Sequence, residues 1–290
     1  MKHHADTEER ELGMRLLAEH YPQLAVDKAE VIQTGGIKSV WKVHMSQGTW
    51  CLKRIRKSTA VQVYLHGKGA LVADIVRTKD DRLYFVHDGY ALVLYMWIEG
   101  SDLFMDEAPD LYTGLKGLAQ FHNASVGFMP PADGQMYDRM GEWLRHYRKM
   151  RDELTQWRNE SKRETSAFHR SYWNTAGGMI SMADQAIQWL EQSCYSQWVQ
   201  SIGQYGPLCH QDYGKGNALL TKQGVYILDL DNLAYDIPVR DARKLITKRM
   251  ERLGRWDQRR VLYIDLLFPH PITEMSNGFS RKKSPTKGVG

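Results

Sequence analysis

One part of the chain constrains its fold more than any other. The run HQDYGKGN at residues 210–217 is followed by ILDLD at residues 227–231, and the apolar stretches between them predict a β-hairpin. A hairpin brings the end of its second strand back beside the start of its first. The side chains of Asn217 and Asp229 are therefore expected to face one cleft, with Asp212 at its rim.

This loop and hairpin carry the side chains that phosphoryl transfer needs. Such catalysis comes mostly from positioning and charge neutralisation, with a carboxylate near the acceptor hydroxyl and oxygen ligands for magnesium. Asp212 is expected to be the base, and Asn217 and Asp229 to hold Mg²⁺ through hard oxygen donors. Each residue alone fits turn chemistry as well, but their conjunction is much rarer by chance than any one of them. His210 is interpreted as a residue that orders the loop through hydrogen bonds.

The N-terminal part of the chain is expected to form an antiparallel meander. A helix comes first, capped by Asp6 and ending before Pro22. Strand-like runs separated by turn residues follow, and the last of them ends before Glu99 and Gly100. The runs cover residues 31–33, 40–43, 50–55, 84–86 and 90–98.

Beyond this sheet, apolar residues recur at helical spacing, beginning at Leu111. Two further stripes, at residues 143–157 and 183–198, each predict a helix. The expected fold class is therefore α+β with two lobes and a ligand site in the cleft. Its expected parts are a small sheet lobe over residues 1–98, a larger helical lobe over 99–268 and a disordered tail over 269–290.

Composition narrows the class of protein further. The chain of 290 residues has an ordinary globular balance, with 42% hydrophobic and 25% charged residues. Its cysteines, Cys51, Cys194 and Cys209, lack metal-ligand spacing and favour a reducing compartment. Neither an export signal nor a membrane anchor is expected, because no apolar run approaches ~20 residues. Nucleic-acid binding is not expected either, since part of the net charge of +5 lies in the terminal SRKKSPTK segment.

Five motifs carry a resemblance to known proteins, and they are LCHQDYGKGNALL, VYILDLDNLAYDIPVRDARKLI, YMWIEG, LAQFHNAS and YSQWV. The His-x-Asp-x-x-x-x-Asn spacing resembles that of the aminoglycoside phosphotransferase and choline kinase branch of the protein-kinase-like fold. The choices of Gln211, Tyr213 and Lys215 point more closely to the CotS family of bacterial spore coat proteins. The resemblance runs from about the first glycine turn to Phe268.

This resemblance implies a two-lobed kinase-like fold and a site for ATP. It also implies Asp212 as the catalytic base, with Asn217 and Asp229 as the magnesium ligands. Lys53 is implied to be the strand lysine that reaches the nucleotide phosphates. Strand alternation turns it inward, although a plain exposed lysine fits the pattern about equally well. Nucleotide contacts are also implied for a glycine turn and an interlobe hinge, which comprise Gly35, Gly36, Tyr95, Met96 and Trp97. Asp236 and Asp241 are interpreted as structural, through loop formation and helix capping.

The sequence departs from the kinase pattern in two places. Between Lys53 and Asp74 it has no acidic residue, so the usual ion pair of the strand lysine with a helix glutamate cannot form there. We expect a partner from outside that helix, with Asp229 as a candidate. Gly214 and Lys215 stand where the antibiotic kinases usually show His and Pro, so an aminoglycoside is not the expected acceptor.

Two functions remain open. The chain is expected to be made in the cytoplasm of the sporulating cell and then deposited in the spore coat, with other coat proteins as partners. In the first interpretation it is a phosphotransferase that uses ATP and Mg²⁺ to phosphorylate a hydroxyl acceptor. In the alternative it is a catalytically inactive, kinase-fold structural component of the coat.

Overall fold

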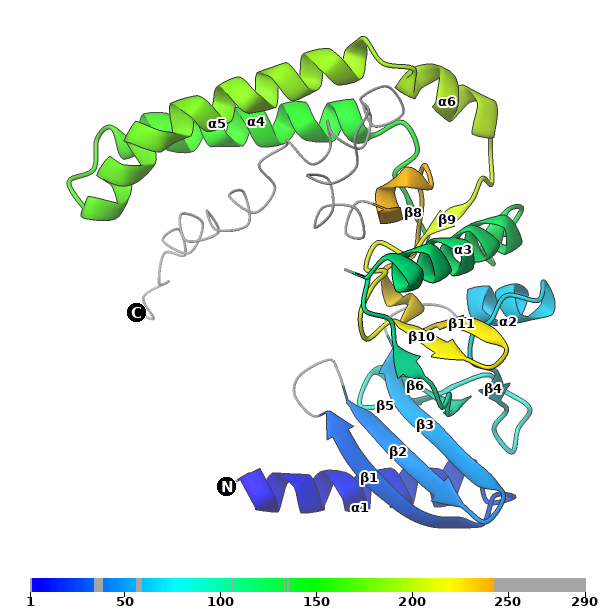
Figure 1. Cartoon of the computed structure of the whole chain (residues 1–290). Coiled ribbons are helices and arrows are strands. Elements are labelled where there is room, and N and C mark those ends of the chain that lie inside the picture. Colours follow the sequence, from blue (N-terminus) through cyan, green and yellow to red (C-terminus); the bar gives the residue numbers. More distant parts are fainter. Residues whose placement is uncertain are drawn as a thin grey trace. The chain divides into compact units, whose positions relative to one another are not determined.

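The computed structural model divides the chain into two units (Figure 1), Met1–Asp138 with Tyr205–Leu245 and Arg139–Gln204 with Ile246–Gly290. The residues that it describes are 2–33, 39–55, 59–105, 107–132, 134 and 136–242. Gly35, Gly36 and the predicted tail lie outside the described residues. The lobe boundary expected at residue 98 stays a prediction.

The first unit opens with a helix and the predicted antiparallel sheet. Helix α1 spans Lys2–His20, so it begins before Asp6, and the prediction that Asp6 caps it is wrong. The sheet has the order β1-β2-β3-β6-β4, and β5 pairs with β6. Its strands are β1 Val26–Gln33, β2 Val40–Met45, β3 Gly48–Ile55, β4 Ile75–Val76, β5 Phe85–His87 and β6 Tyr90–Met96.

Helix α1 covers one face of this sheet. Leu16 and Leu17 are buried in one cluster with Trp41 of β2, whose indole Nε1–H donates to the Glu9 carbonyl at 2.9 Å. Side chains alternate between the two faces of a strand. Because Trp41 pairs with Leu52 on the covered face, the neighbouring Lys53 belongs to the opposite face.

In the described part of the chain, the rest of the first unit contains short strands, the helices α2 and α3, and a helical turn over residues 239–242. The hairpin β10-β11 is present as predicted, and β10 also pairs with β7. Strand β12 joins β8 and β9 in a third sheet. The elements are α2 Ala60–Gly67, β7 Ser101–Asp102, α3 Ala108–Ser125, β8 Tyr137–Asp138, β9 Leu208–Cys209, β10 Ala218–Thr221, β11 Gly224–Ile227, the 3₁₀ turn η1 Leu230–Asn232 and β12 Ala234–Tyr235.

The second unit consists of helices in its described part, namely α4 Trp143–Ser161, α5 Ala167–Glu191 and α6 Tyr195–Ile202. The stripe at 143–157 predicts α4 correctly. The prediction of one helix over 183–198 is wrong, because α5 ends at Glu191. The hydroxyl of Ser193 donates to the Leu190 carbonyl and accepts from the Tyr195 N–H, which offers the backbone an alternative to a continuous helix.

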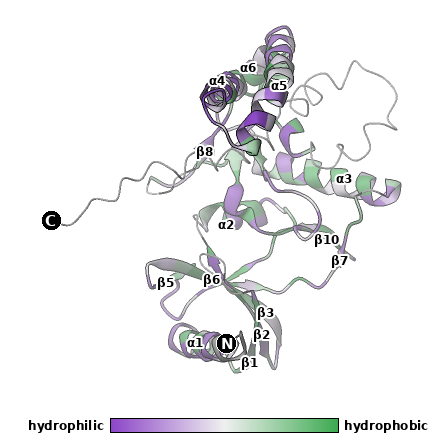
Figure 2. Ribbon diagram, turned by 90° about the vertical axis from the view of Figure 1, so that its left-hand side faces the viewer, coloured by the Kyte–Doolittle hydropathy of each residue, from purple (hydrophilic) through white to green (hydrophobic). Residues whose placement is uncertain are grey.

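Helix α3 mixes hydrophobic and hydrophilic residues along its length (Figure 2), and it packs on β11 through a glycine. A Cβ atom added at Gly117 would stand 2.6 Å from the Cβ of Val225. Side chains essentially never approach so closely in a packed core. The absence of a side chain at Gly117 therefore lets α3 and β11 approach, and β11 leads directly into Asp229.

Gly117→Ala is expected to lower the free energy of unfolding by about 1–3 kcal/mol, the usual effect of overpacking. Gly178→Ala in α5 is the matched control, because nothing lies within 4 Å of an added Cβ there. That control is expected to raise the free energy of unfolding by up to about 1 kcal/mol through helix propensity. Urea unfolding measures both changes. Equal stabilisation by the two substitutions would contradict the close packing of α3 on β11.

Candidate active site

A pocket of about 340 Å³ lies within the first unit. Side chains from the sheet face opposite α1 line one side of it, and residues from β10, β11 and η1 line another. The predicted site residues in its lining are Lys53, Tyr95, Met96, Trp97, Asn217 and Asp229. Asp212 is outside the lining but contacts one of these residues, as described below.

Lys53 projects into this pocket. Its Nζ lies 2.6 Å from Asp229 Oδ1 and 3.3 Å from Asp231 Oδ2, and the lysine side chain is 16% exposed. Burial would lower the pKa of Lys53, but attraction to Asp231 and Asp229 outweighs that effect and the pKa lies above its ordinary value. The expectation of a partner from outside the usual helix is confirmed, and an exposed strand lysine is excluded.

Helix α2 contributes a neutral side chain to the pocket. Gln62 is buried with 7% exposure, lines the pocket and donates its amide Nε2–H to the Ala73 carbonyl. The helix ends at Gly67, followed by Gly69 with a φ of +79°. The helix is therefore short, and an amide faces the pocket in place of a carboxylate.

The backbone conformation of Asp229 directs two carboxylates into the pocket. Asp229 adopts the left-handed region, with φ 59° and ψ 67°, and joins the end of β11 to η1. Asp231 follows within η1 and lines the same pocket. Burial raises the pKa of Asp231, Lys53 lowers it and Asp229 raises it, and the pKa stays above its ordinary value. Sequence reasoning missed Asp231, although its i, i+2 spacing from Asp229 was a usable signal.

Asn217 connects the predicted base to the pocket. Its amide Nδ2–H donates to the Asp212 carbonyl at 2.9 Å and approaches the Asp212 carboxylate at 3.4 Å. The Leu228 N–H donates to the Asn217 carbonyl at 2.9 Å, which fixes the loop to the end of β11. Neither amide contact uses Oδ1 of Asn217, the atom that can ligate a metal ion.

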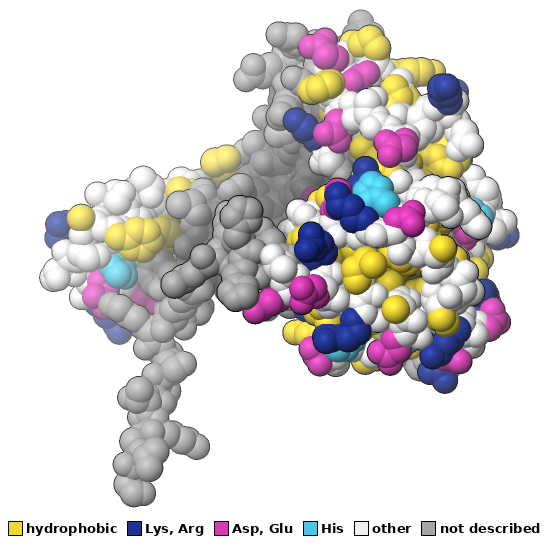
Figure 3. Space-filling view, turned by 90° about the horizontal axis from the view of Figure 1, so that it is seen from below, with side chains coloured by type: hydrophobic (Ala, Val, Ile, Leu, Met, Phe, Trp, Pro, Cys, Tyr) yellow, Lys and Arg dark blue, Asp and Glu magenta, His cyan; other side chains and the backbone are white. Residues whose placement is uncertain are grey.

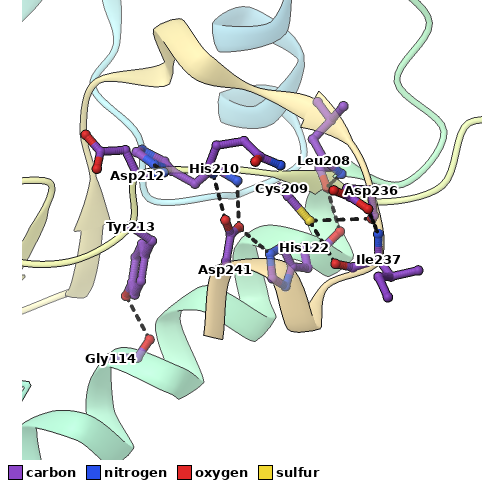
Figure 4. A network of polar contacts seen from close by, with 12 residues as sticks. Gly114, His122, Leu208, Cys209, His210, Asp212, Tyr213, Asp236, Ile237 and Asp241 are labelled. Carbon is purple, nitrogen blue, oxygen red and sulfur yellow. Dashed lines mark hydrogen bonds and ion pairs between the residues drawn. The ribbon is translucent and has the colours of Figure 1, made fainter. Parts of the chain in front are cut away.

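A buried carboxylate anchors the loop that carries Asp212 (Figure 4). Asp241 accepts hydrogen bonds from the backbone N–H groups of His210 at 2.6 Å and Gln211 at 2.7 Å, and its Oδ2 lies 2.9 Å from His122 Nε2. Asp241 is therefore a loop anchor, which fits its structural interpretation. Asp236 fits its structural interpretation, because its carboxylate accepts from the following Ile237 N–H.

His210 orders the loop, as its position indicated. Its Nε2 lies 2.8 Å from the Leu228 carbonyl, which can only accept, and its Nδ1 accepts from the Asp212 N–H at 3.3 Å. This pattern requires the neutral imidazole with the proton on Nε2. Burial lowers the pKa of His210 and so favours that neutral form.

His122, Cys209 and Asp241 bring potential metal ligands within 4.8 Å of one another. Their hydrogen bonds assign them to the loop anchor instead. Both Asp241 oxygens accept backbone N–H groups, and the Cys209 thiol donates to the carbonyls of Asp236 and Ile237. Burial raises the pKa of Cys209 well above its ordinary value, which disfavours the thiolate that a metal binds.

The fold is that of kinase-like phosphotransferases. An aminoglycoside phosphotransferase from Alicyclobacillus acidocaldarius subsp. acidocaldarius DSM 446 superposes with a TM-score of 0.69 at 19% identity, over 90% of this chain and 84% of that one. A spectinomycin phosphotransferase in complex with ADP and spectinomycin gives a TM-score of 0.61 at 16% identity, over 96% of this chain and 91% of that one. An amicoumacin kinase in complex with AMP-PNP, Ca²⁺ and Ami gives a TM-score of 0.53 at 14% identity, over 91% of this chain and 77% of that one.

The family follows from the sequence match. Residues 15–270 match the family described as "Spore coat putative kinase YutH", and the chain belongs to this family. Spore coat protein S of Bacillus subtilis (strain 168) is 24% identical over 300 residues, which cover 92% of this chain and 84% of that protein. The predicted α+β kinase-like fold, the resemblance to CotS-type coat proteins and the association with the spore coat are confirmed.

The surface adds two observations. None of the described helices is long and apolar enough to cross a membrane. On the face seen in Figure 3, acidic and basic side chains of the described residues lie next to one another. The described basic side chains therefore do not form a separate patch on that face.

Proposed function

We propose that this spore coat kinase-like protein is a phosphotransferase that moves the terminal phosphoryl group of ATP to a hydroxyl group. The observation that carries the proposal is the convergence of Lys53, Asn217 and Asp229 on one pocket. Lys53 and Asp229 are 176 positions apart in the chain, yet their charged atoms are 2.6 Å apart. Convergence of a cation, an amide and a carboxylate in a partly apolar pocket suits a nucleotide phosphate site.

The apolar part of the pocket fits a nucleobase beside the hinge. The N–H groups of Met96 and Trp97 donate to the carbonyls of Asp74 at 2.9 Å and Thr49 at 3.1 Å, so they are committed to the sheet. Within the described part of the chain the Ile98 N–H has no such acceptor, and Ile98 lines the pocket. Base recognition is therefore expected from the Ile98 N–H and the hinge carbonyls.

The polar part of the pocket fits magnesium. Asn217 offers an amide oxygen and Asp229 a carboxylate, and Mg²⁺ prefers such hard oxygen donors. A bound Mg²⁺ would neutralise charge on the phosphates. Asn217 and Asp229 would hold the ion, and Lys53 would hold the phosphate oxygens through its ammonium group.

Asp212 would act on the acceptor. Its carboxylate would take the proton of the acceptor hydroxyl as the hydroxyl oxygen forms a bond to the terminal phosphorus, and ADP would leave with the bridging oxygen. His210 and Asn217 position Asp212 through the contacts at its N–H and its carbonyl. The loop is thereby fixed to the same strand end that carries Asp229.

One observation favours the second candidate function, an inactive structural component of the coat. Helix α2 presents Gln62 to the pocket, and active protein kinases pair the strand lysine with a glutamate from the corresponding helix. The same purified protein separates the two functions. Incubation with ATP, Mg²⁺ and a panel of hydroxyl compounds, with the protein itself included as an acceptor, is expected to yield ADP and a phosphorylated acceptor. The structural function predicts neither product.

Asp229→Asn is expected to weaken magnesium-dependent ATP binding on the order of tenfold to a hundredfold, because the anchoring charge for the ion is lost. Asp27→Asn is the matched control, since Asp27 is exposed on β1 and outside the pocket. Isothermal titration with AMP-PNP, with Mg²⁺ or with EDTA, measures the effect. Equal affinity of the Asp229→Asn variant and the wild type in Mg²⁺ would contradict the proposed role.

A further inference from the structure

The described residues that line the pocket carry more negative than positive charge. Among the described residues that line it, Lys53, Asp229 and Asp231 are the charged ones. The side chains of the two aspartates are only 25% and 16% exposed. A buried carboxylate needs a compensating cation, and one lysine compensates one of the two. The proposed occupant, a nucleotide polyphosphate, would add further negative charge.

The two carboxylates reach the same point in the pocket. One ammonium nitrogen, Lys53 Nζ, lies 2.6 Å from Asp229 and 3.3 Å from Asp231. The left-handed backbone at Asp229 makes this possible, because it turns the chain from β11 into η1 between the two residues. A small cation that contacts Asp229 in this region can therefore also be contacted by Asp231.

Helix α2 supplies none of this charge. Gln62 is buried and lines the pocket, but its side chain is neutral and its Nε2–H is committed to the Ala73 carbonyl. The second carboxylate near Lys53 comes from Asp231 instead. Lys53 contacts both carboxylates, but its single positive charge balances only one of the two negative charges. The aspartate pair therefore keeps a net charge of −1, which a further cation can balance.

We propose that Asp231 is a metal-binding residue of the nucleotide site and that, with Asp229, it holds a divalent cation that accompanies the nucleotide. The proposal rests on the proposed function. It adds Asp231 to the metal ligands Asn217 and Asp229. It also predicts that nucleotide binding depends on metal more strongly with two carboxylates in the site than with one. The expected ion is Mg²⁺ or Mn²⁺, because the ligands are oxygen atoms.

The test is Asp231→Asn, with AMP-PNP titrated in Mg²⁺ and in EDTA. Removal of a negative charge is expected to leave AMP-PNP affinity in EDTA unchanged or several-fold higher, and to lower the affinity in Mg²⁺ about tenfold. Only the affinity in Mg²⁺ is expected to fall, because the carboxylate repels the free nucleotide and attracts its metal complex. Asp231→Glu, which keeps the charge, is expected to retain most of the metal dependence.

Three results would overturn the proposal. Equal loss of affinity with and without metal would assign Asp231 to positioning Lys53. Unchanged affinity under both conditions would remove Asp231 from the site, whereas the wild type would still bind the magnesium complex and the proposed function would stand. If the wild-type chain bound AMP-PNP with equal affinity in Mg²⁺ and in EDTA, the proposed function would be overturned as well. Asp27→Asn controls for net charge, and thermal unfolding of each variant in EDTA controls for folding.

Discussion

Asp212→Asn is expected to lower the turnover of phosphoryl transfer about 10²–10⁴-fold, the range that general base catalysis contributes. The affinity for magnesium ATP is expected to stay within about twofold, because Asp212 is outside the lining of the pocket. The asparagine keeps the size of the side chain and the backbone contacts with His210 and Asn217. Steady-state rates of ADP formation with an acceptor, together with AMP-PNP titration, measure both quantities.

The contrast with Asp229→Asn makes this prediction specific. Loss of the charge at Asp229 acts on binding, whereas loss of the charge at Asp212 acts on the chemical step. Both variants are expected to remain folded, with changes in the free energy of unfolding within about 1–2 kcal/mol. Full turnover by Asp212→Asn, or a loss of binding equal to that of Asp229→Asn, would show that Asp212 is not the base.

Asp241→Ala is expected to lower the free energy of unfolding by about 3–5 kcal/mol. The substitution leaves the backbone N–H groups of His210 and Gln211 and the buried His122 imidazole without their common acceptor. Asp241 itself is 3% exposed, so water cannot easily replace the carboxylate. The same change is expected to reduce turnover, because the loop that carries Asp212 loses its anchor. Denaturant unfolding gives the free energy.

Asp241→Asn is the milder comparison, since its amide retains one acceptor oxygen. It is expected to lower the free energy of unfolding by less than Asp241→Ala does. Asp27→Ala provides the surface control and is expected to change stability by less than about 0.5 kcal/mol. Wild-type stability in Asp241→Ala would mean that the loop does not depend on this carboxylate.

Much of the fold was predictable because its signals are local. Alternation within β3 is enough to place Leu52 and Lys53 on opposite faces of the sheet. The loop and hairpin at 210–229 are likewise close in sequence, so the approach of Asn217 to Asp212 and to the end of β11 follows from spacing. The pairing of Lys53 with Asp229 could be named only as a candidate, because it depends on tertiary packing.

The parts that escaped prediction depend on backbone conformation and long-range contacts. Nothing in a sequence marks Asp229 as left-handed, yet that conformation brings Asp231 into the pocket. Asp241 looks like a helix cap, and only the fold places it against backbone 30 positions earlier. The break between α5 and α6 was hidden because the apolar stripe continues in phase through Cys194, while the hydrogen bonds of Ser193 end the helix.

The central claim is that the pocket around Lys53, Asn217 and Asp229 is a metal-dependent nucleotide site. Isothermal titration of the wild-type chain with ATP, in Mg²⁺ and then in EDTA, tests it most directly. We predict one binding site per chain in Mg²⁺ and an affinity at least about tenfold lower in EDTA. Absence of ATP binding, or equal affinity under both conditions, would contradict the claim and leave the kinase-like fold as a structural component of the spore coat.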